Sequence, residues 1–269
     1  MTLADTPPPS KPGTARRFRM ARTVSALILR EMGSRYGRSP GGYIWAVLEP
    51  MSMIAILSLG FALIARSPPL GTSFILFFGV GFAPFSMYQG VSMSVARSLI
   101  FSRALLTYPV VTWVDAVTAR FLLNMLTGLL VMALVLTMII LSLEDPILID
   151  PQPVVDATAM AILFSLGIGT LNCALIGLIS VWDKIWGIIN RPLFLVSGII
   201  FLYEDMPPLA QDILWYNPLV HIVGMMRSGF YPTYEALYVS EAYVAGTALL
   251  SLFMGVVLLR RYHRHILSR

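Results

Sequence analysis

The chain has 269 residues, of which 57% are hydrophobic and only 12% are charged, and its formal net charge is +5. Soluble globular domains carry about a quarter charged residues, so a soluble fold of this length could not hide so much apolar surface. The composition excludes an ordinary soluble protein and indicates a polytopic membrane protein.

The N-terminal region divides into two parts. Residues 1–15 are rich in proline and predict a disordered cytoplasmic tail. Residues 16–38 predict an amphipathic helix, with one apolar side and one basic side at about 100° per residue. The apolar side holds Met20, Val24, Leu27 and Ile28, and the basic side holds Arg16, Arg19, Arg22 and Arg30. We expect this helix to lie in the interface, held by anionic lipids.

Apolar runs long enough to cross a bilayer, for which about 20 residues suffice, make up most of the remaining chain. The six runs are residues 43–64, 73–93, 121–143, 157–181, 185–203 and 242–259. Because backbone polar groups in lipid must be satisfied internally, and the runs lack the alternation of barrel strands, we expect helices. Residues 39–259 are therefore predicted to form an all-α domain of six transmembrane helices. Gly167, Gly169 and Gly177 predict close helix packing in the fourth run.

Charge alternates between successive loops. All of the 19 Lys and Arg except Arg66 and Arg227 lie in the N-terminal segment, the connector at 94–120, the turn at 182–191 and the tail at 260–269. The other loops hold most of the acids, namely Glu144, Asp145, Asp150, Asp156, Glu204, Asp205, Asp212, Glu235 and Glu241. Because positive charge stays cytoplasmic, both termini and the connector are predicted to be cytoplasmic.

The loop at 204–241 is then periplasmic, yet it is too apolar for a solvated loop. It is also too short and interrupted to span, which predicts a re-entrant or surface-lying helical pair. Aromatic residues crowd this region, among them Tyr203, Trp215, Tyr216, Phe230 and Tyr231. They form either an interfacial aromatic belt or a set of platforms on which sugar rings stack at a pore mouth.

No catalytic constellation is visible in the sequence. The histidines are His221, His263 and His265, and no Cys/His cluster has metal-ligand spacing. The lysines, Lys11 and Lys184, lie outside any Gly-Lys-Ser/Thr phosphate loop. We therefore expect no enzymatic activity and no cofactor or metal in this chain, and no nucleic-acid partner. If transport is driven by ATP, another polypeptide must hydrolyse it.

Two charged residues lie within the apolar runs and leave alternatives open. Glu49 is either buried in the first run, where a carboxylate is costly and usually functional, or faces a cytoplasmic vestibule. Arg191 either reaches the cytoplasmic surface or faces an aqueous cavity and meets an anionic substrate.

Three stretches carry a family resemblance: RYGRSPGGYIWAVLEP (35–50), FSRALLTYPVVTWVDAVTARFLLN (101–124) and NPLVHIVGMMRSGFYP (217–232). Together they resemble the permease subunit of Gram-negative capsular-polysaccharide ABC exporters, of the ABC-2 type. The resemblance implies an inner-membrane homodimer with re-entrant helices before its last span. It also implies two separate ATP-binding-cassette subunits, which bind ATP and Mg²⁺, a periplasmic co-polymerase-like adaptor, and a lipid-linked polysaccharide cargo.

The same resemblance suggests roles for particular residues. The connector, whose helical halves meet at Tyr108-Pro109, would be a coupling element that docks on the ATPase. Its apolar docking residues would be Leu99, Ile100, Phe101, Leu105 and Leu106, with Arg97 and Arg103 at the polar rim. Glu49, Arg191 and the aromatic residues Tyr203, Trp215, Tyr216, Phe230 and Tyr231 would line the substrate path.

Other interpretations remain open from the sequence. The connector could be a surface-lying helix without a partner. The cargo could be an O-antigen or a teichoic acid. A proton-coupled secondary transporter would need a relay, for which Glu49 is the candidate, and a membrane-embedded transferase would need clustered polar residues that the scattered acids do not provide.

Overall fold

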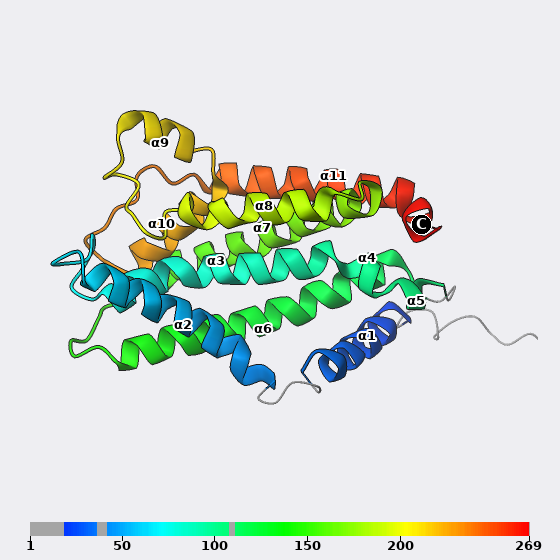
Figure 1. Cartoon of the computed structure of the whole chain (residues 1–269), viewed down its shortest axis with the longest axis horizontal. Helices are drawn as coiled ribbons and strands as arrows, with labels where there is room; N and C mark the ends of the chain where they lie inside the picture. Colours follow the sequence, from blue (N-terminus) through cyan, green and yellow to red (C-terminus); the bar gives the residue numbers. More distant parts are fainter. Residues whose placement is uncertain (1–18, 37–41, 108–110, 269) are drawn as a thin grey trace, which may run out of the picture.

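The computed structural model describes residues 19–36, 42–107 and 111–268, and these form helices and turns without a strand (Figure 1). This confirms the all-α class. The helices are α1 (Arg19–Tyr36), α2 (Gly42–Ala62), α3 (Phe74–Ala96), α4 (Ser98–Phe101), α5 (Arg103–Leu106), α6 (Trp113–Leu141), α7 (Pro151–Leu178), α8 (Trp182–Leu195), α9 (Pro208–Leu214), α10 (Pro218–Phe230) and α11 (Glu241–Ser268).

Among the described residues, five helices are long and apolar enough to cross a membrane: α2 from Ile44, α3, α6, α7 and α11 as far as Leu267. They correspond to five of the predicted runs. In the most apolar stretch of α3, 67% of the residues are buried, against 17% in α2, so α3 is the central helix and α2 lies at the edge.

The connections gather at opposite ends of these helices. The turns at 63–73 and 142–150, together with α9 and α10, lie at one end, whereas α1, α4, α5 and the end of α11 lie at the other (Figure 1). At this second end Arg120 of α6 pairs with Glu31 of α1 over 3.2 Å, which fixes α1 against the bundle. The loops that hold most of the acids lie at the first end, and the basic N-terminal helix, connector and C-terminal tail lie at the second.

The fifth predicted run differs from the sequence-based expectation. α8 has 14 residues and ends at Leu195, which is short of the roughly 20 that cross a bilayer. Beyond it Gly198 has a φ of +75°, a conformation that glycine adopts without steric cost. The prediction of one continuous helix over 185–203 is therefore wrong, and the count of six spans stays a prediction. Residues 196–203 are called the broken segment below.

Backbone carbonyls of the broken segment accept hydrogen bonds from side chains at the two ends of α10. Arg227, only 1% exposed, donates from Nη1 to the carbonyl of Phe201 over 2.9 Å and from Nη2 to that of Ile199 over 3.0 Å. Its guanidinium also lies 4.2 Å from the ring centre of Phe77. Among the described residues no carboxylate forms an ion pair with it. The sequence predicted Arg227 to lie in a periplasmic loop. In the structure Arg227 lies in α10 and its guanidinium binds the carbonyls that the break in the fifth run leaves without helical partners.

Asn217, the N-cap residue of α10, reinforces the same contact. Its side chain accepts a hydrogen bond from the backbone N–H of Leu219 over 3.1 Å and donates one to the carbonyl of Val196 over 2.9 Å. Both ends of α10 thus supply donors to carbonyls that a continued helix would have occupied. Non-helical backbone in a membrane protein requires such partners.

The region at 204–241 contains the predicted helical pair. α9 has no buried residue and lies on the surface, whereas nearly all of α10 is buried and packs against α3 and α7. Whether α10 enters the bilayer as a re-entrant helix stays a prediction.

Glycines bring α7 close to its neighbours, as the sequence predicted. A Cβ atom on Gly167 would collide with the backbone carbonyl of Ala248 in α11, and one on Gly169 would lie 2.8 Å from Cβ of Val95 in α3. Gly177 meets the side chain of Ile266 in the same way. The expectation of close packing at these glycines is confirmed.

Gly167→Val should destabilise the protein by about 1–3 kcal/mol, because the new side chain overfills a backbone contact. Gly246→Val in α11 is the matched control, since no atom lies within 4 Å of its added Cβ. The midpoint of thermal unfolding in detergent should fall for the first variant and stay near wild type for the second. Equal midpoints would contradict the close α7–α11 contact.

Arg227→Lys should also lower the unfolding midpoint, by an amount that corresponds to about 1–3 kcal/mol for buried carbonyls left without donors. A lysine carries the charge but not the planar fork that reaches two carbonyls at once. The control is Arg66→Lys, the same exchange at an exposed position of the same end. If both variants unfold together, the broken segment does not depend on the guanidinium.

Candidate functional site

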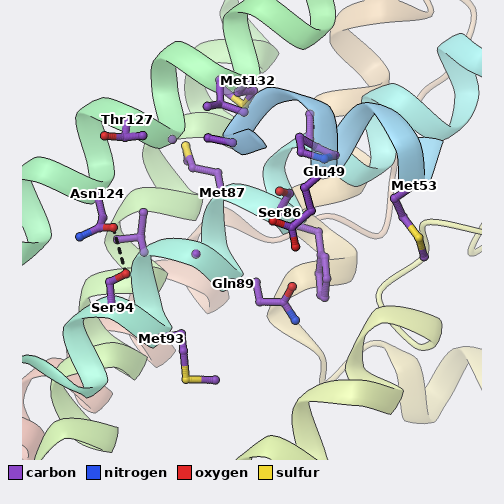
Figure 2. Close-up of a pocket in the computed structure, with 18 of the residues that line it drawn as sticks. Glu49, Met53, Ser86, Met87, Gln89, Met93, Ser94, Asn124, Thr127 and Met132 are labelled. Carbon is purple, nitrogen blue, oxygen red and sulfur yellow. Dashed lines mark hydrogen bonds between the residues drawn. The ribbon is translucent and has the colours of Figure 1, made fainter. Parts of the chain in front are cut away.

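A groove of about 1440 Å³ opens on one side of the bundle, between α2, α3, α6 and α8 (Figure 2). Ligand pockets for small molecules usually measure roughly 300–1,000 Å³, so this space suits a longer ligand. Glu49 of α2 and Arg191 of α8 both line it and both are exposed. The structure thus brings together in one groove two charged residues that lie far apart in the sequence, and a role for either in a substrate path stays a prediction.

Uncharged polar side chains line the groove along α3 and α6. Ser86 and Gln89 come from α3, and Thr127 comes from α6 (Figure 2). Ser94 donates a hydrogen bond of 2.9 Å to the side-chain oxygen of Asn124, which ties the two helices together across the groove wall. Such groups can form hydrogen bonds with a hydroxyl-rich ligand.

Methionines supply the apolar part of the lining. Met53 comes from α2, Met87 and Met93 from α3, and Met132 from α6. Methionine side chains are flexible and polarisable, so they adapt to ligands of varied shape. The groove therefore combines hydrogen-bonding groups with an adaptable apolar surface.

The polar lining of the groove was not predicted from the sequence, although the sequence contains a signal for it. The polar groove residues of α3 and its C-cap lie at positions 86, 89, 94 and 97, among apolar and small lining residues of the same helix. This spacing is that of one face of a helix. A polar face on an otherwise apolar run indicates an aqueous surface, but it does not tell which helices lie opposite.

One end of the groove reaches the connector, whose residues 108–110 lie outside the described part of the chain. Arg97, Phe101 and Arg120 contribute to the lining here. The guanidinium of Arg120 lies 4.5 Å from the ring centre of Phe101. Two of the predicted coupling residues, Arg97 and Phe101, therefore line the same groove as Glu49 and Arg191.

The predicted docking residues of the connector differ in their accessibility. Ile100 and Phe101 are 54% and 61% exposed, and Arg103 is exposed as well. Leu105 and Leu106 are half-buried. Leu99, in contrast, is 2% exposed and packs in the core, so the prediction that it docks on a partner is corrected.

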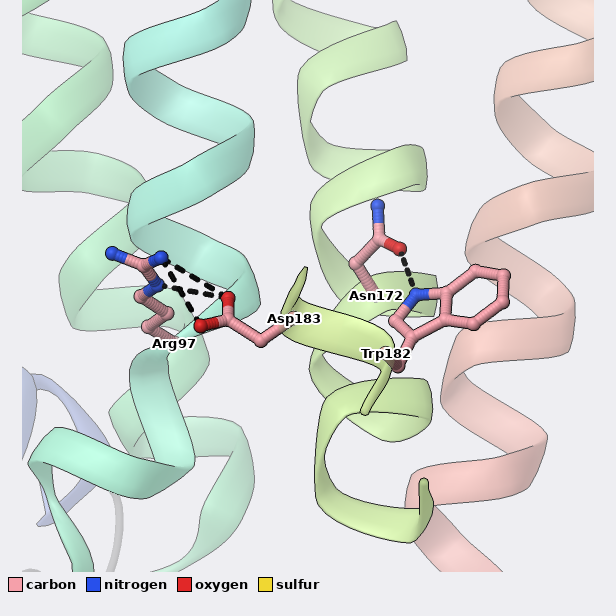
Figure 3. A network of polar contacts seen from close by, with 4 residues as sticks. All are labelled: Arg97, Asn172, Trp182 and Asp183. Carbon is pink, nitrogen blue, oxygen red and sulfur yellow. Dashed lines mark hydrogen bonds and ion pairs between the residues drawn. The ribbon is translucent and has the colours of Figure 1, made fainter. Parts of the chain in front are cut away.

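Arg97 forms a contact that the sequence did not predict. It lies between α3 and α4 and pairs with Asp183 in the first turn of α8 over 3.1 Å (Figure 3). It therefore links two elements within this chain, whereas the sequence analysis placed it at the rim of an interface with another protein.

The predicted aromatic platforms are mostly a packed cluster. Phe230 and Tyr231 are 4% and 7% exposed and belong to the core, which corrects their assignment to an open path. Tyr203 stacks on Tyr238 with ring centres 4.1 Å apart. Trp215 donates from Nε1 to the carbonyl of Tyr238 over 3.2 Å. Tyr216 is exposed, and none of these aromatic side chains lines the groove.

His221 lies at the centre of this cluster in one defined tautomer. Its Nδ1 accepts from the backbone N–H of Ser240 over 3.1 Å, so Nε2 carries the hydrogen and donates to the carbonyl of Trp215 over 2.7 Å. Burial lowers the pKa of His221 below its usual value, which favours this neutral form. Both ring nitrogens are occupied, so His221 supports α10 and offers no free ligand atom.

Comparison with known proteins shows which family this chain belongs to. Residues 22–231, which include the groove and the connector, match the family described as ABC-2 type transporter. The chain belongs to the ABC-2 type transporter family.

The relatives of this family member are similar over nearly their whole length. The polysialic acid transport protein KpsM of Escherichia coli is 30% identical over 91% of this chain and 95% of its own. The capsule polysaccharide export inner-membrane protein BexB of Haemophilus influenzae is 27% identical over 91% and 92%. CtrC of Neisseria meningitidis serogroup B, named likewise, is 23% identical over 91% and 92%. With its five apolar helices, this chain too is an inner-membrane protein.

Proposed function

We propose that the chain is the transmembrane subunit of an ATP-driven exporter, which moves lipid-linked capsular polysaccharide across the inner membrane. The observation that carries this proposal is the similarity to capsule export proteins over 91% of the chain. The polar groove supports it, because a sugar polymer presents many hydroxyl groups and needs a path larger than a small-molecule pocket.

A separate nucleotide-binding subunit would hydrolyse the ATP, since the sequence has no phosphate loop. The connector is the docking element in this proposal. Ile100 and Phe101 offer exposed apolar surface, and Arg103 offers charge at its edge. This mixture suits a protein interface with an apolar centre and a polar rim.

The polymer would pass along the groove in a homodimer. Trp45 and Leu48 of α2 line the groove and are 60% and 44% exposed, so a second copy placed against α2 would close its open side. Glu49 and Arg191 would meet the polymer near the cytoplasmic end. Contacts would be weak and repeated, because a sliding chain must also be released.

The orientation follows from the charges. The end that carries α1, α4 and α5 would face the cytoplasm, with α1 lying on anionic lipids. The end that carries α9 and α10 would face the periplasm and an adaptor protein. An O-antigen or a teichoic acid is the rival cargo, and analysis of the exported polymer separates these possibilities.

Reversing charge in the connector should abolish the ATPase contact. We expect a Walker-type ATPase to co-purify with the wild-type chain in mild detergent and to be lost with Arg103→Glu combined with Leu105→Asp. The matched control is Arg264→Glu, which reverses an exposed charge in α11 at the same end. Loss of the ATPase in the control as well would indicate a general charge effect.

An ATPase that the connector variant retains would move the docking site elsewhere. No ATPase with any variant, in a preparation that transports solute along a proton gradient, would contradict the exporter and leave Glu49 as a candidate relay.

Arg191→Ala should lower polymer export and polymer-stimulated ATP hydrolysis by up to about fivefold, the effect of one exposed charge contact. Lys184→Ala removes an exposed charge from the same helix outside the groove and should have no effect. Unchanged export and stimulation in the Arg191 variant would exclude that charge from the polymer path.

A further inference from the structure

We infer that the ion pair between Arg97 and Asp183 is a positioning contact, which transmits movement of the connector to α8 and thereby to one wall of the groove. The inference rests on the proposed function and deepens it, because it names the link between the docking element and the polymer path.

The contact has a defined geometry. Arg97 donates from Nε and Nη2 to one carboxylate oxygen of Asp183 over 3.2 and 3.1 Å, and from Nη2 to the other over 3.3 Å (Figure 3). A planar guanidinium that holds a carboxylate through several hydrogen bonds restricts orientation as well as distance. Asp183 also lies in the first turn of α8, where a negative charge is favoured by the helix dipole.

Arg97 lies where the connector begins. It is both the C-cap residue of α3 and the N-cap residue of α4. A docked partner that shifts α4 also shifts Arg97. Because the guanidinium of Arg97 is hydrogen-bonded to the carboxylate of Asp183, Asp183 shifts with it. Asp183 itself lies outside the connector, so it can be altered without changing the exposed docking residues.

α8 can move when Asp183 is displaced, because few of its side chains are packed against the rest of the protein. Of its residues only Asn190 is buried. Trp182 anchors its start by donating from Nε1 to the side-chain oxygen of Asn172 over 2.7 Å (Figure 3). Near its end the ring of Phe194 lies 5.9 Å from that of Phe82. A helix fixed mainly at its two ends turns or tilts when one end is moved.

The face that carries Asp183 leads into the groove. Asn190 and Phe194 follow Asp183 by seven and eleven residues, which at about 100° per residue places all three on one side of α8. Asn190, Arg191 and Phe194 line the groove. A displacement at Asp183 therefore reaches Asn190 and Arg191 along one helix, in which Pro192 comes only after these two residues.

Stability does not account for this pair. The side chains of Arg97 and Asp183 are 41% and 40% exposed, and exposed ion pairs contribute little to the stability of a fold. Removing the pair should leave the protein folded, which makes a role in transmission testable apart from one in folding.

The test compares Asp183→Arg, Asp183→Asn and the exchanged pair Arg97→Asp with Asp183→Arg. Three quantities are measured for each: the ATPase that co-purifies, the rate of ATP hydrolysis and the polymer exported per ATP hydrolysed. Lys184→Glu is the matched control, because it reverses the neighbouring exposed charge, which forms no ion pair among the described residues.

We expect Asp183→Arg to retain the ATPase and to lower export per ATP at least about fivefold, the lower end of usual coupling between sites. Asp183→Asn should show a smaller loss in the same direction. The exchanged pair should recover most of the export per ATP, and Lys184→Glu should match wild type. Recovery by exchange is an outcome that a general loss of folding could not produce.

Wild-type export per ATP in Asp183→Asn and Asp183→Arg would overturn the inference, as would an exchanged pair that retains the ATPase yet recovers nothing. If Asp183→Arg does not fold, Asp183→Asn decides, because it keeps the shape of the side chain. The proposed function fails separately, when the wild-type chain neither retains an ATPase nor exports polysaccharide.

Discussion

The buried guanidinium of Arg227 is the contact on which the arrangement of the fifth run depends. A chain in a membrane must satisfy its backbone polar groups from within, and a helix does so by default. The broken segment leaves that default, and its carbonyls at Ile199 and Phe201 accept hydrogen bonds from Arg227. Because these donors come from α10, the break in the fifth run depends on α10 being packed beside it.

Ending the helix at Leu195 has a consequence for the groove. α8 is left short and lightly packed beside α3, whose polar face lines the same space. Its position is then set by contacts at its ends, of which the Arg97–Asp183 pair reaches the connector. A continuous, well-packed fifth helix would have been a rigid wall. The short helix instead gives the groove one side whose position depends on polar contacts.

Much of the architecture was predictable because it depends on composition over long windows. Five apolar runs became five long helices, since the bilayer sets both their length and their backbone bonding. The alternation of basic and acidic loops matches the two ends of the bundle, and the glycines of α7 mark close packing, as at Gly167. Glu49 and Arg191, which both line the groove, could also be singled out from the sequence, because a charge within an apolar run is costly.

Tertiary contacts decided what hydropathy could not. Leu99, Phe230 and Tyr231 have the same character as exposed apolar residues nearby, and only the helices packed over them make them core. The groove needed α2, α6 and α8 to be placed around one face of α3, a relation between residues far apart in the chain. Sequence by itself determined which five segments form helices long and apolar enough to cross a membrane, because length and apolar composition are properties of each segment alone. Which side chains meet one another was decided by packing.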